Sequence, residues 1–214
     1  LPIIETQDIQ KYYTKIREEQ KILEEEDVFL EAGRDVSLFK GEKILLTRSP
    51  KDESFIIASY CKEDVVFRNS VYGIPLGENT DLAKYLFAIF NSKLFTYYQY
   101  LFSSNWGVYY PIINKTEYLS FPFLDSNQFE DEVIKTVTDF IQSFIEKEGN
   151  TSVNQLQLEI LDKIVDNIYS ITEYEKDIID YALNISRFQF QGSKQHLITD
   201  FTYLDENHYR NQTK

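Results

Sequence analysis

The sequence predicts an α+β fold: a twisted, mainly antiparallel sheet with a packed helix, followed by a C-terminal helical hairpin. Three observations predict it. Between residues 39 and 76, short runs rich in β-branched and aromatic residues alternate with turn residues, as antiparallel strands do. Over residues 81–102, apolar residues recur every three or four positions, which is helical spacing. The same spacing fills most of residues 125–185.

The strands are expected at residues 43–48, 54–60, 65–67 and 70–76, with a turn at 49–53 that contains Pro50 and Asp52. Thr80 is a suitable cap for a single helix over 81–102. After it, residues 108–113 are expected as a strand, and residues 118–123 as an extended segment around Pro122.

The C-terminal region predicts two amphipathic helices that are separated by a stop at residues 148–150, which include Gly149. A third helix is expected from Thr172, which forms a capping-box pattern with Glu175. Residues 7–26 are charged and predict a solvated helix or linker. The expected organisation is a charged N-terminal helix or linker at 1–35, an α/β domain at 36–124, helices at 125–186 and a polar tail at 187–214.

Net charge is −13, which argues against nucleic-acid binding until its distribution is considered. Residues 1–35 carry −5, residues 36–120 carry +1 and residues 121–214 carry −9. The acidity therefore belongs to the two flanks. A balanced middle segment can present a local basic face, but it is too poor in positive charge to be a strong non-specific phosphate binder alone.

The chemistry of catalysis is not evident. The sequence has no glycine-rich phosphate loop, no dinucleotide motif and no Asn-Pro-Pro-Tyr or Asp-Pro-Pro-Tyr tetrapeptide. His196 and His208 have no neighbours at metal-ligand spacing, and Cys61 is expected as a small buried hydrophobe. We therefore expect no catalytic residue, metal or cofactor in this chain. Asp8, followed by Glu19 and Lys21, resembles the spacing of metal-binding residues in many restriction nucleases. In those enzymes the carboxylates lie on strands, whereas here they fall in a segment that is expected to be helical, so we do not expect a nuclease site.

The chain begins at Leu1 and has no methionine, so we expect a fragment of a larger protein. The most apolar stretch, residues 82–102, is broken by lysines and amides and is too polar for lipid. The first twenty residues lack the pattern of a signal peptide, and a single cysteine allows no internal disulfide. A cytoplasmic setting is expected.

Four segments appear in a characteristic order: residues 39–48 (FKGEKILLTR), 68–74 (RNSVYGI), 91–94 (NSKL) and 110–122, which includes YPIINK and LSFP. This order resembles the specificity domain of TaqI-type N6-adenine DNA methyltransferases and of fused type II restriction-modification enzymes. It is also similar to half of a type I specificity subunit. Residues 161–175 (LDKIVDNIYSITEYE) resemble the stretch that closes many such domains, although Ser170 stands where glycine is usual and Asp166, followed by Asn167, where tyrosine is common.

The resemblance implies that the chain recognises double-stranded DNA for a bacterial adenine-specific methyltransferase, with or without nuclease activity. S-adenosylmethionine and the methyl transfer would belong to a catalytic domain of the same polypeptide or of a partner subunit. Helices 125–185 would dock onto that part. The alternative is a protein-interaction module in which the acidic helices bind a basic partner or mimic DNA.

The expected DNA contacts follow from position. Basic residues at strand ends and turns can reach phosphates while a sheet holds them. The loop at 105–110 combines amide, glycine and aromatic groups that can contact base edges or stack on a base. The same residues are equally consistent with a loop packed against the protein. Each of the basic residues, considered alone, could instead be an ordinary solvated surface charge. The expected set is Lys43, Arg48, Lys51, Lys62, Arg68, Asn105, Trp106, Tyr109, Tyr110 and Lys115.

Overall fold

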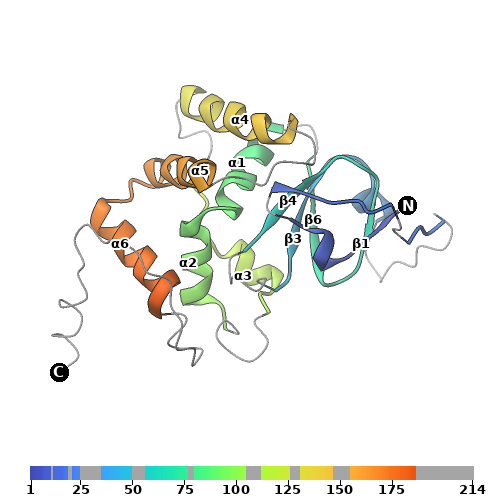
Figure 1. Ribbon diagram of the computed structural model, residues 1–214, viewed down its shortest axis with the longest axis horizontal. Helices are drawn as coiled ribbons and strands as arrows, with labels where there is room; N and C mark the ends of the chain where they lie inside the picture. Colours follow the sequence, from blue (N-terminus) through green and yellow to red (C-terminus); the bar gives the residue numbers. More distant parts are fainter. Residues whose placement is uncertain are drawn as a thin grey trace.

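The computed structural model describes residues 1–10, 12–18, 21–24, 35–49, 56–76, 80–104, 112–125, 131–146 and 155–186. Strands gather on one side of the molecule and helices on the other (Figure 1). The main sheet has four strands in the order β2-β4-β3-β6. These are β2 (Tyr12–Tyr13), β4 (Ala58–Cys61), β3 (Lys43–Thr47) and β6 (Val71–Pro75).

Strand β3 pairs antiparallel with β4 and with β6, while β2 adds in parallel to the outer edge of β4. A second, two-stranded sheet joins β1 (Ile3–Ile4) in parallel to β5 (Val66–Phe67). The expected α+β fold with a mainly antiparallel sheet is confirmed.

Both faces of β3 are covered, because side chains alternate along a strand. Ile44 and Leu46 belong to the large core shared with the helices, whereas Leu45 belongs to a second core formed with Ile4, Phe39 and Val66, among others. All five residues of β3 are therefore buried. Gly73, which pairs with Leu45, permits this packing, since a Cβ atom there would lie 2.3 Å from the ring of Phe67.

The N-terminal segment does not form the expected helix over 7–26 in its described residues. It contains a 3-10 turn at Thr6–Asp8 and strand β2 instead. Ile4 and Ile9 are fully buried, and Tyr12–Tyr13 pairs with Ser59–Tyr60 of β4. Backbone pairing with a distant strand thus outweighs the local charge pattern on which the helix prediction rested.

The single helix expected over 81–102 is two helices, α1 (Thr80–Phe90) and α2 (Lys93–Phe102). Asn91 and Ser92 lie in the break, where the Ser92 side chain accepts a hydrogen bond from the amide of Phe95 and caps α2. A short helix, α3 (Lys115–Leu119), replaces the first part of the segment expected to be extended. Ile112 and Ile113 are not in a strand, and residues 105–111 lie outside the described residues.

The C-terminal helices follow the prediction: α4 (Asp131–Glu146), α5 (Gln155–Ile168) and α6 (Glu173–Tyr181), which continues as a π-helical turn over Ala182–Ser186. The capping box of Thr172 and Glu175 is confirmed. The expected stop at 148–150 and the tail lie outside the described residues. None of the described helices is long and apolar enough to span a membrane.

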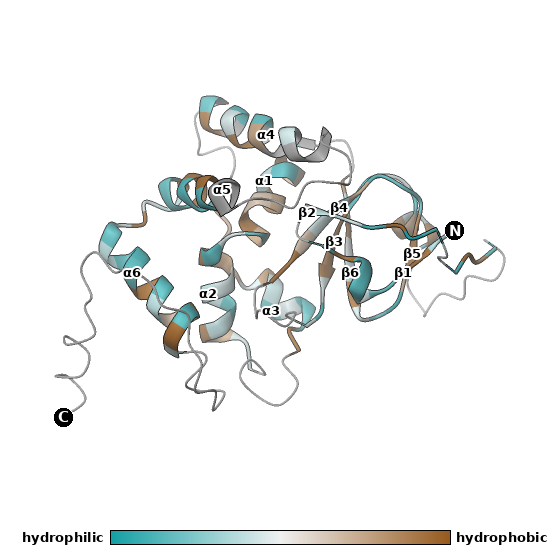
Figure 2. Ribbon diagram, in the orientation of Figure 1, coloured by the Kyte–Doolittle hydropathy of each residue, from teal (hydrophilic) through white to brown (hydrophobic). Residues whose placement is uncertain are grey.

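The C-terminal helices pack on the same core as the sheet. Helix α4 lies against α1, and α5 and α6 lie against α2 (Figure 1). Val137 of α4 and Leu161 and Val165 of α5 share one buried cluster with Ile44 of β3. The hydrophobic residues accordingly concentrate on the sheet and on the inner faces of the helices (Figure 2).

Candidate nucleic-acid interface

One end of the main sheet is formed where β3 ends and β6 begins. The amide of Arg48 donates to the carbonyl of Ser70 over 2.9 Å, and the amide of Ile113 donates to the carbonyl of Arg48 over 2.9 Å. The segment before α3 is therefore fixed beside the two strands. We call these residues, Arg48, Arg68–Val71 and Ile113–Lys115, the Arg48 end of the sheet.

Three of the expected DNA contacts lie together at the Arg48 end. Arg68, in the turn before β6, and Lys115, the first residue of α3, are exposed. Arg48 is half-buried, and its guanidinium donates to Oδ1 of Asn114 over 3.5 Å, so it also ties β3 to α3. The two exposed side chains are free to reach a phosphate from a rigid base, as positioning contacts require.

The expected aromatic loop also starts and ends here. Asn105, Trp106, Tyr109 and Tyr110 lie outside the described residues, as does Lys51. Before the 105–111 segment, Ser104 is held at α3 by its hydrogen bond to Glu117; after it, Ile113 is held at the end of β3 by its hydrogen bond to Arg48. Likewise, the chain leaves β3 at Arg48 towards Lys51. The described geometry thus brings the attachment points of all these residues to one end of the sheet.

Lys43 is in a different position and has no exposed surface. It is the first residue of β3, and its Nζ donates to the carbonyls of Gly41 and Glu63. Burial lowers the pKa of this lysine, although Cys61, Asp64 and Glu63 act in the opposite direction. The second core covers this face of β3, so Lys43 holds two loops together and is not placed to contact DNA.

Lys62 is exposed but lies at the opposite end of the sheet, directly after β4. Its sequence neighbours Glu63 and Asp64 are acidic, and Asp64 pairs with Lys40 at 3.7 Å. The balance of charge at that end is unfavourable for a phosphate. The structure therefore divides the basic residues that the sequence grouped together.

The profile of the TaqI-like C-terminal specificity domain matches residues 1–122, more than half of the chain. The chain belongs to this family. Membership gives it a DNA-recognition role in a restriction-modification enzyme. No curated protein matches the sequence. The match starts at residue 1, which agrees with the pairing of β1 and β2 into the sheets, and it ends before α4.

The NSKL segment of the specificity domain anchors three parts of the fold. Oδ1 of Asn91 accepts from the amide of Ala58 over 3.1 Å, which fixes the helix pair to β4. Ser92 caps α2, and the amide of Lys93 donates to Asp162 of α5 over 2.9 Å. Through these contacts the segment holds the helices to the sheet.

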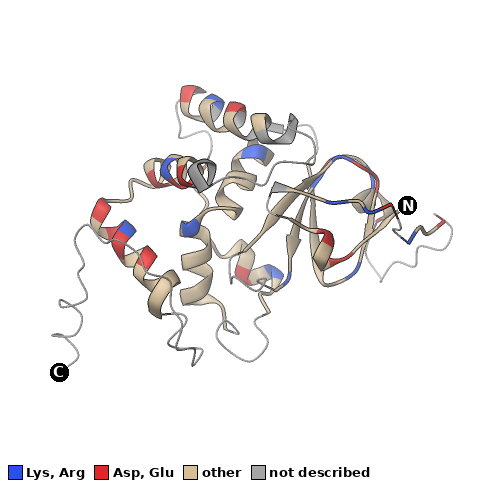
Figure 3. Cartoon of the chain, in the orientation of Figure 1, with Lys and Arg blue, Asp and Glu red and all other residues tan. Residues whose placement is uncertain are grey.

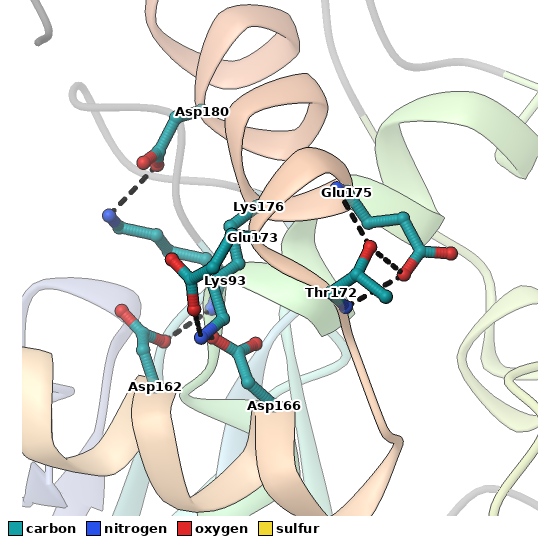
Figure 4. Close-up of polar contacts among 8 residues, drawn as sticks. All are labelled: Lys93, Asp162, Asp166, Thr172, Glu173, Glu175, Lys176 and Asp180. Atoms are coloured by element: carbon teal, nitrogen blue, oxygen red, sulfur yellow. Dashed lines mark hydrogen bonds and ion pairs between the residues drawn. The ribbon is translucent and has the colours of Figure 1, made fainter. Parts of the chain in front are cut away.

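A charged cleft of about 350 Å³ lies between α2, α5 and α6 of the specificity domain. Nζ of Lys93 pairs with Asp180 at 2.9 Å, and Nζ of Lys176 lies 3.8 Å from Asp166 and 2.7 Å from Glu173 (Figure 4). Burial and the neighbouring Asp162 raise the pKa of Asp166 to about 6. Because Lys93 and Lys176 are paired with carboxylates of the cleft, these contacts join α2 to α5 and α6.

The sequence drew attention to Asp8 and Cys61 as residues with possible catalytic chemistry, and both are buried. No group of three or more His, Cys, Asp or Glu side chains in this part of the chain is placed to hold a metal ion. Asp8, of the nuclease-like pattern, is buried and pairs with Arg17 at 2.7 Å. Cys61 is buried as expected, and burial raises the pKa of its thiol to about 11, which disfavours the reactive thiolate.

The charges drawn on the described chain do not form a continuous basic stripe. Basic residues are spaced singly over the domain, and acidic residues predominate on α4, α5 and α6 (Figure 3). A few fixed cations at the Arg48 end therefore suit positioning of a duplex better than strong non-specific attraction to it.

Proposed function

We propose that this chain selects the DNA sequence on which a bacterial N6-adenine methyltransferase or restriction-modification enzyme acts. Methyl transfer from S-adenosylmethionine would take place in a separate catalytic part, and the setting would be the cytoplasm. The observation that carries the proposal is the convergence at the Arg48 end. There, Arg68 and Lys115 are exposed beside both attachment points of the aromatic segment.

The proposed mechanism is binding. Arg68 and Lys115 would fix the phosphate backbone, and side chains of the 105–111 segment would contact the bases in a groove. Sequence-independent attraction is weak because the chain is acidic overall. The catalytic part is then needed to close around the duplex, and α4–α6, which lie beyond the family match, are the proposed docking surface for it.

Charge reversal tests the DNA face. In the R68E/K115E variant, we expect affinity for a pool of random-sequence 30-bp duplexes to fall at least about tenfold. The slope of log affinity against log salt should become shallower by about two, one for each lost phosphate contact. The matched control is K135E/K163E, which reverses two exposed lysines of α4 and α5. Fluorescence anisotropy across a salt series measures both quantities.

Equal affinity for wild type and R68E/K115E would refute the proposed face. A K62E variant adds a second comparison, because Lys62 lies at the other end of the sheet. If K62E weakened binding as much as R68E/K115E, the duplex would have to contact both ends.

The alternative function, a protein-interaction module, is favoured by the predominance of acidic residues on α4–α6 (Figure 3). Under the proposal, this surface contacts the catalytic part. If the chain bound a basic protein but no duplex at any salt concentration, the alternative would replace the proposal.

A further inference from the structure

The carboxylate of Glu117 joins two points of the chain that are distant in sequence. Its Oε1 accepts hydrogen bonds from the amide and the hydroxyl of Ser104, both over 2.7 Å. Its Oε2 accepts from the amide of Asn114 over 2.6 Å. Ser104 and Asn114 are the nearest described polar anchors before and after the 105–111 segment.

The backbone of Glu117 extends this junction to the neighbouring elements. Its carbonyl accepts from the side-chain amide of Gln99, a fully buried residue of α2, over 3.0 Å. Tyr118, next in sequence, donates from its hydroxyl to the carbonyl of Thr47 at the end of β3 over 2.7 Å. Helix α3 thus fixes the end of α2 and the end of β3 relative to each other, and the Glu117 side chain fixes Ser104 to Asn114.

Glu117 does more than close a helix cap, as a comparison with Glu175 shows. Both glutamates occupy the third position of a helix with a capping box. Glu175 accepts only from the amide and hydroxyl of Thr172, the cap residue of its own helix, over 2.8 and 2.7 Å. Glu117 also binds Ser104, which lies before α3 by 11 residues. The chain therefore contains a natural control.

The carboxylate of Glu117 faces hydrogen-bond donors of the chain itself. Partial burial alone would raise the pKa of this carboxyl, but hydrogen bonds from the amides of Asn114 and Ser104 and the Ser104 hydroxyl outweigh it and lower the pKa. The group is ionised at neutral pH, and both of its oxygens are occupied by donors. An ionised carboxylate facing a phosphate would repel it, so its role at this end of the sheet is to position other groups.

We propose that Glu117 is a positioning residue: by fixing Ser104 and Asn114, which flank the 105–111 segment, to each other at the Arg48 end of the sheet, it sets which DNA sequence is preferred. This inference rests on the proposed function, because it assumes that the segment reads bases. It makes a distinct statement: the affinity for phosphates belongs to Arg68 and Lys115, and the preference among sequences depends on Glu117.

The test compares E117Q with E175Q in the full 214-residue chain. A glutamine has one acceptor oxygen, so it cannot serve Ser104 and Asn114 together. The first readout is hydrogen exchange at the amides of Ser104 and Asn114. The second is selection from a pool of random-sequence duplexes, followed by the affinity ratio between the wild-type-selected duplex and a scrambled duplex.

For E117Q, we expect faster exchange at one or both amides and an affinity ratio at least about tenfold lower than that of wild type. Affinity for the scrambled duplex should stay within about twofold, because the phosphate contacts remain. E175Q should match wild type in both readouts. If E117Q is poorly folded by circular dichroism, the S104A variant replaces it, with a smaller change in the same direction.

An unchanged affinity ratio in folded E117Q would overturn the inference, even if exchange were faster. So would an equal loss in E175Q, since it would show a general effect of helix capping. If wild type itself selected no sequence and bound no duplex, the proposed function would fail and the specificity role with it. The exchange data would then still decide whether Glu117 fixes Ser104 and Asn114 to each other.

Discussion

Asp166 of α5 is an ionisable group whose environment opposes its charged form. Its side chain is 13% exposed, and burial together with Asp162 raises its pKa to about 6, despite the nearby Lys176. A carboxyl whose pKa is higher in the folded than in the unfolded state favours folding when protonated. Its contribution is fully present below about pH 4 and is lost as the pH rises through about 6.

The free energy of unfolding of the D166N variant should therefore depend less on pH than that of wild type between pH 4 and 7. At pH 7 we expect it to be more stable by about 1–2 kcal/mol, below the roughly 3 kcal/mol that a two-unit shift represents, because the contact with Lys176 is lost. Urea denaturation at several pH values measures the change. D139N, at an exposed position of α4, is the control and should follow wild type. A D166N curve parallel to that of wild type would contradict the prediction.

Single residues also show where sequence reasoning succeeds and fails. Lys43, Lys62 and Arg68 look alike in the sequence, since each is basic and stands near a strand end. The structure buries the first, places the second at the far end of the sheet and leaves the third at the Arg48 end. The second core, to which the β1-β5 pairing of residues 63 positions apart contributes, covers the face of β3 that carries Lys43. The antiparallel register of the main sheet places Lys62 and Arg68 at opposite ends. No local pattern carries that information.

At the scale of elements, strands β3, β4 and β6 and the C-terminal helices were predictable because their hydrophobic periods are strong, whereas β2 was not. The break between α1 and α2 was missed, since the apolar stripe passes through it, although Ser92 is a good cap residue. Helix α3 was missed as well. Its capping box of Asn114 and Glu117 is visible in the sequence, but Pro122 favoured an extended interpretation.

The junction between α5 and α6 depends on Ser170, which stands where related sequences were expected to have glycine. It has a φ of 55°, in the left-handed region. The amide of Ile171 donates to the carbonyl of Asp166, and the amide of Ser170 donates to that of Asn167, which is the Schellman pattern that ends a helix. The left-handed conformation is less favourable in free energy for serine than for glycine.

We therefore expect S170G to stabilise the chain by about 1 kcal/mol. The matched control is S143G, the same substitution at an exposed site inside α4, which should destabilise by about 0.5–1 kcal/mol because glycine weakens a helix interior. Thermal or urea unfolding measures both. The explanation fails if the two variants shift stability in the same direction.

At the scale of the whole molecule, the family match and the hydrophobic core suggest different boundaries. The match ends at residue 122, close to the expected division at 124. The core continues across it, because Val137, Leu161 and Val165 are buried with Ile44 of β3 and Phe87 of α1. The joint of Lys93 with Asp162 and Asp180 adds polar contacts across the same division. The helices of 131–186 thus complete the fold of the specificity domain.

A chain that ends at residue 125 should not fold as well as the full chain, although it contains the whole family match. Removal of α4–α6 exposes the apolar faces of α1 and α2, at a cost of several kcal/mol, which is comparable with the total stability of a domain. We expect it to bind a hydrophobic dye and to lose cooperative unfolding. A chain that ends at residue 186 keeps every helix named above and should unfold like the full chain. If the 1–125 chain instead unfolded cooperatively at the same urea midpoint as the full chain, the shared core would contribute little to the stability of the domain. The C-terminal helices would then be a separate unit, as the division at 124 implies.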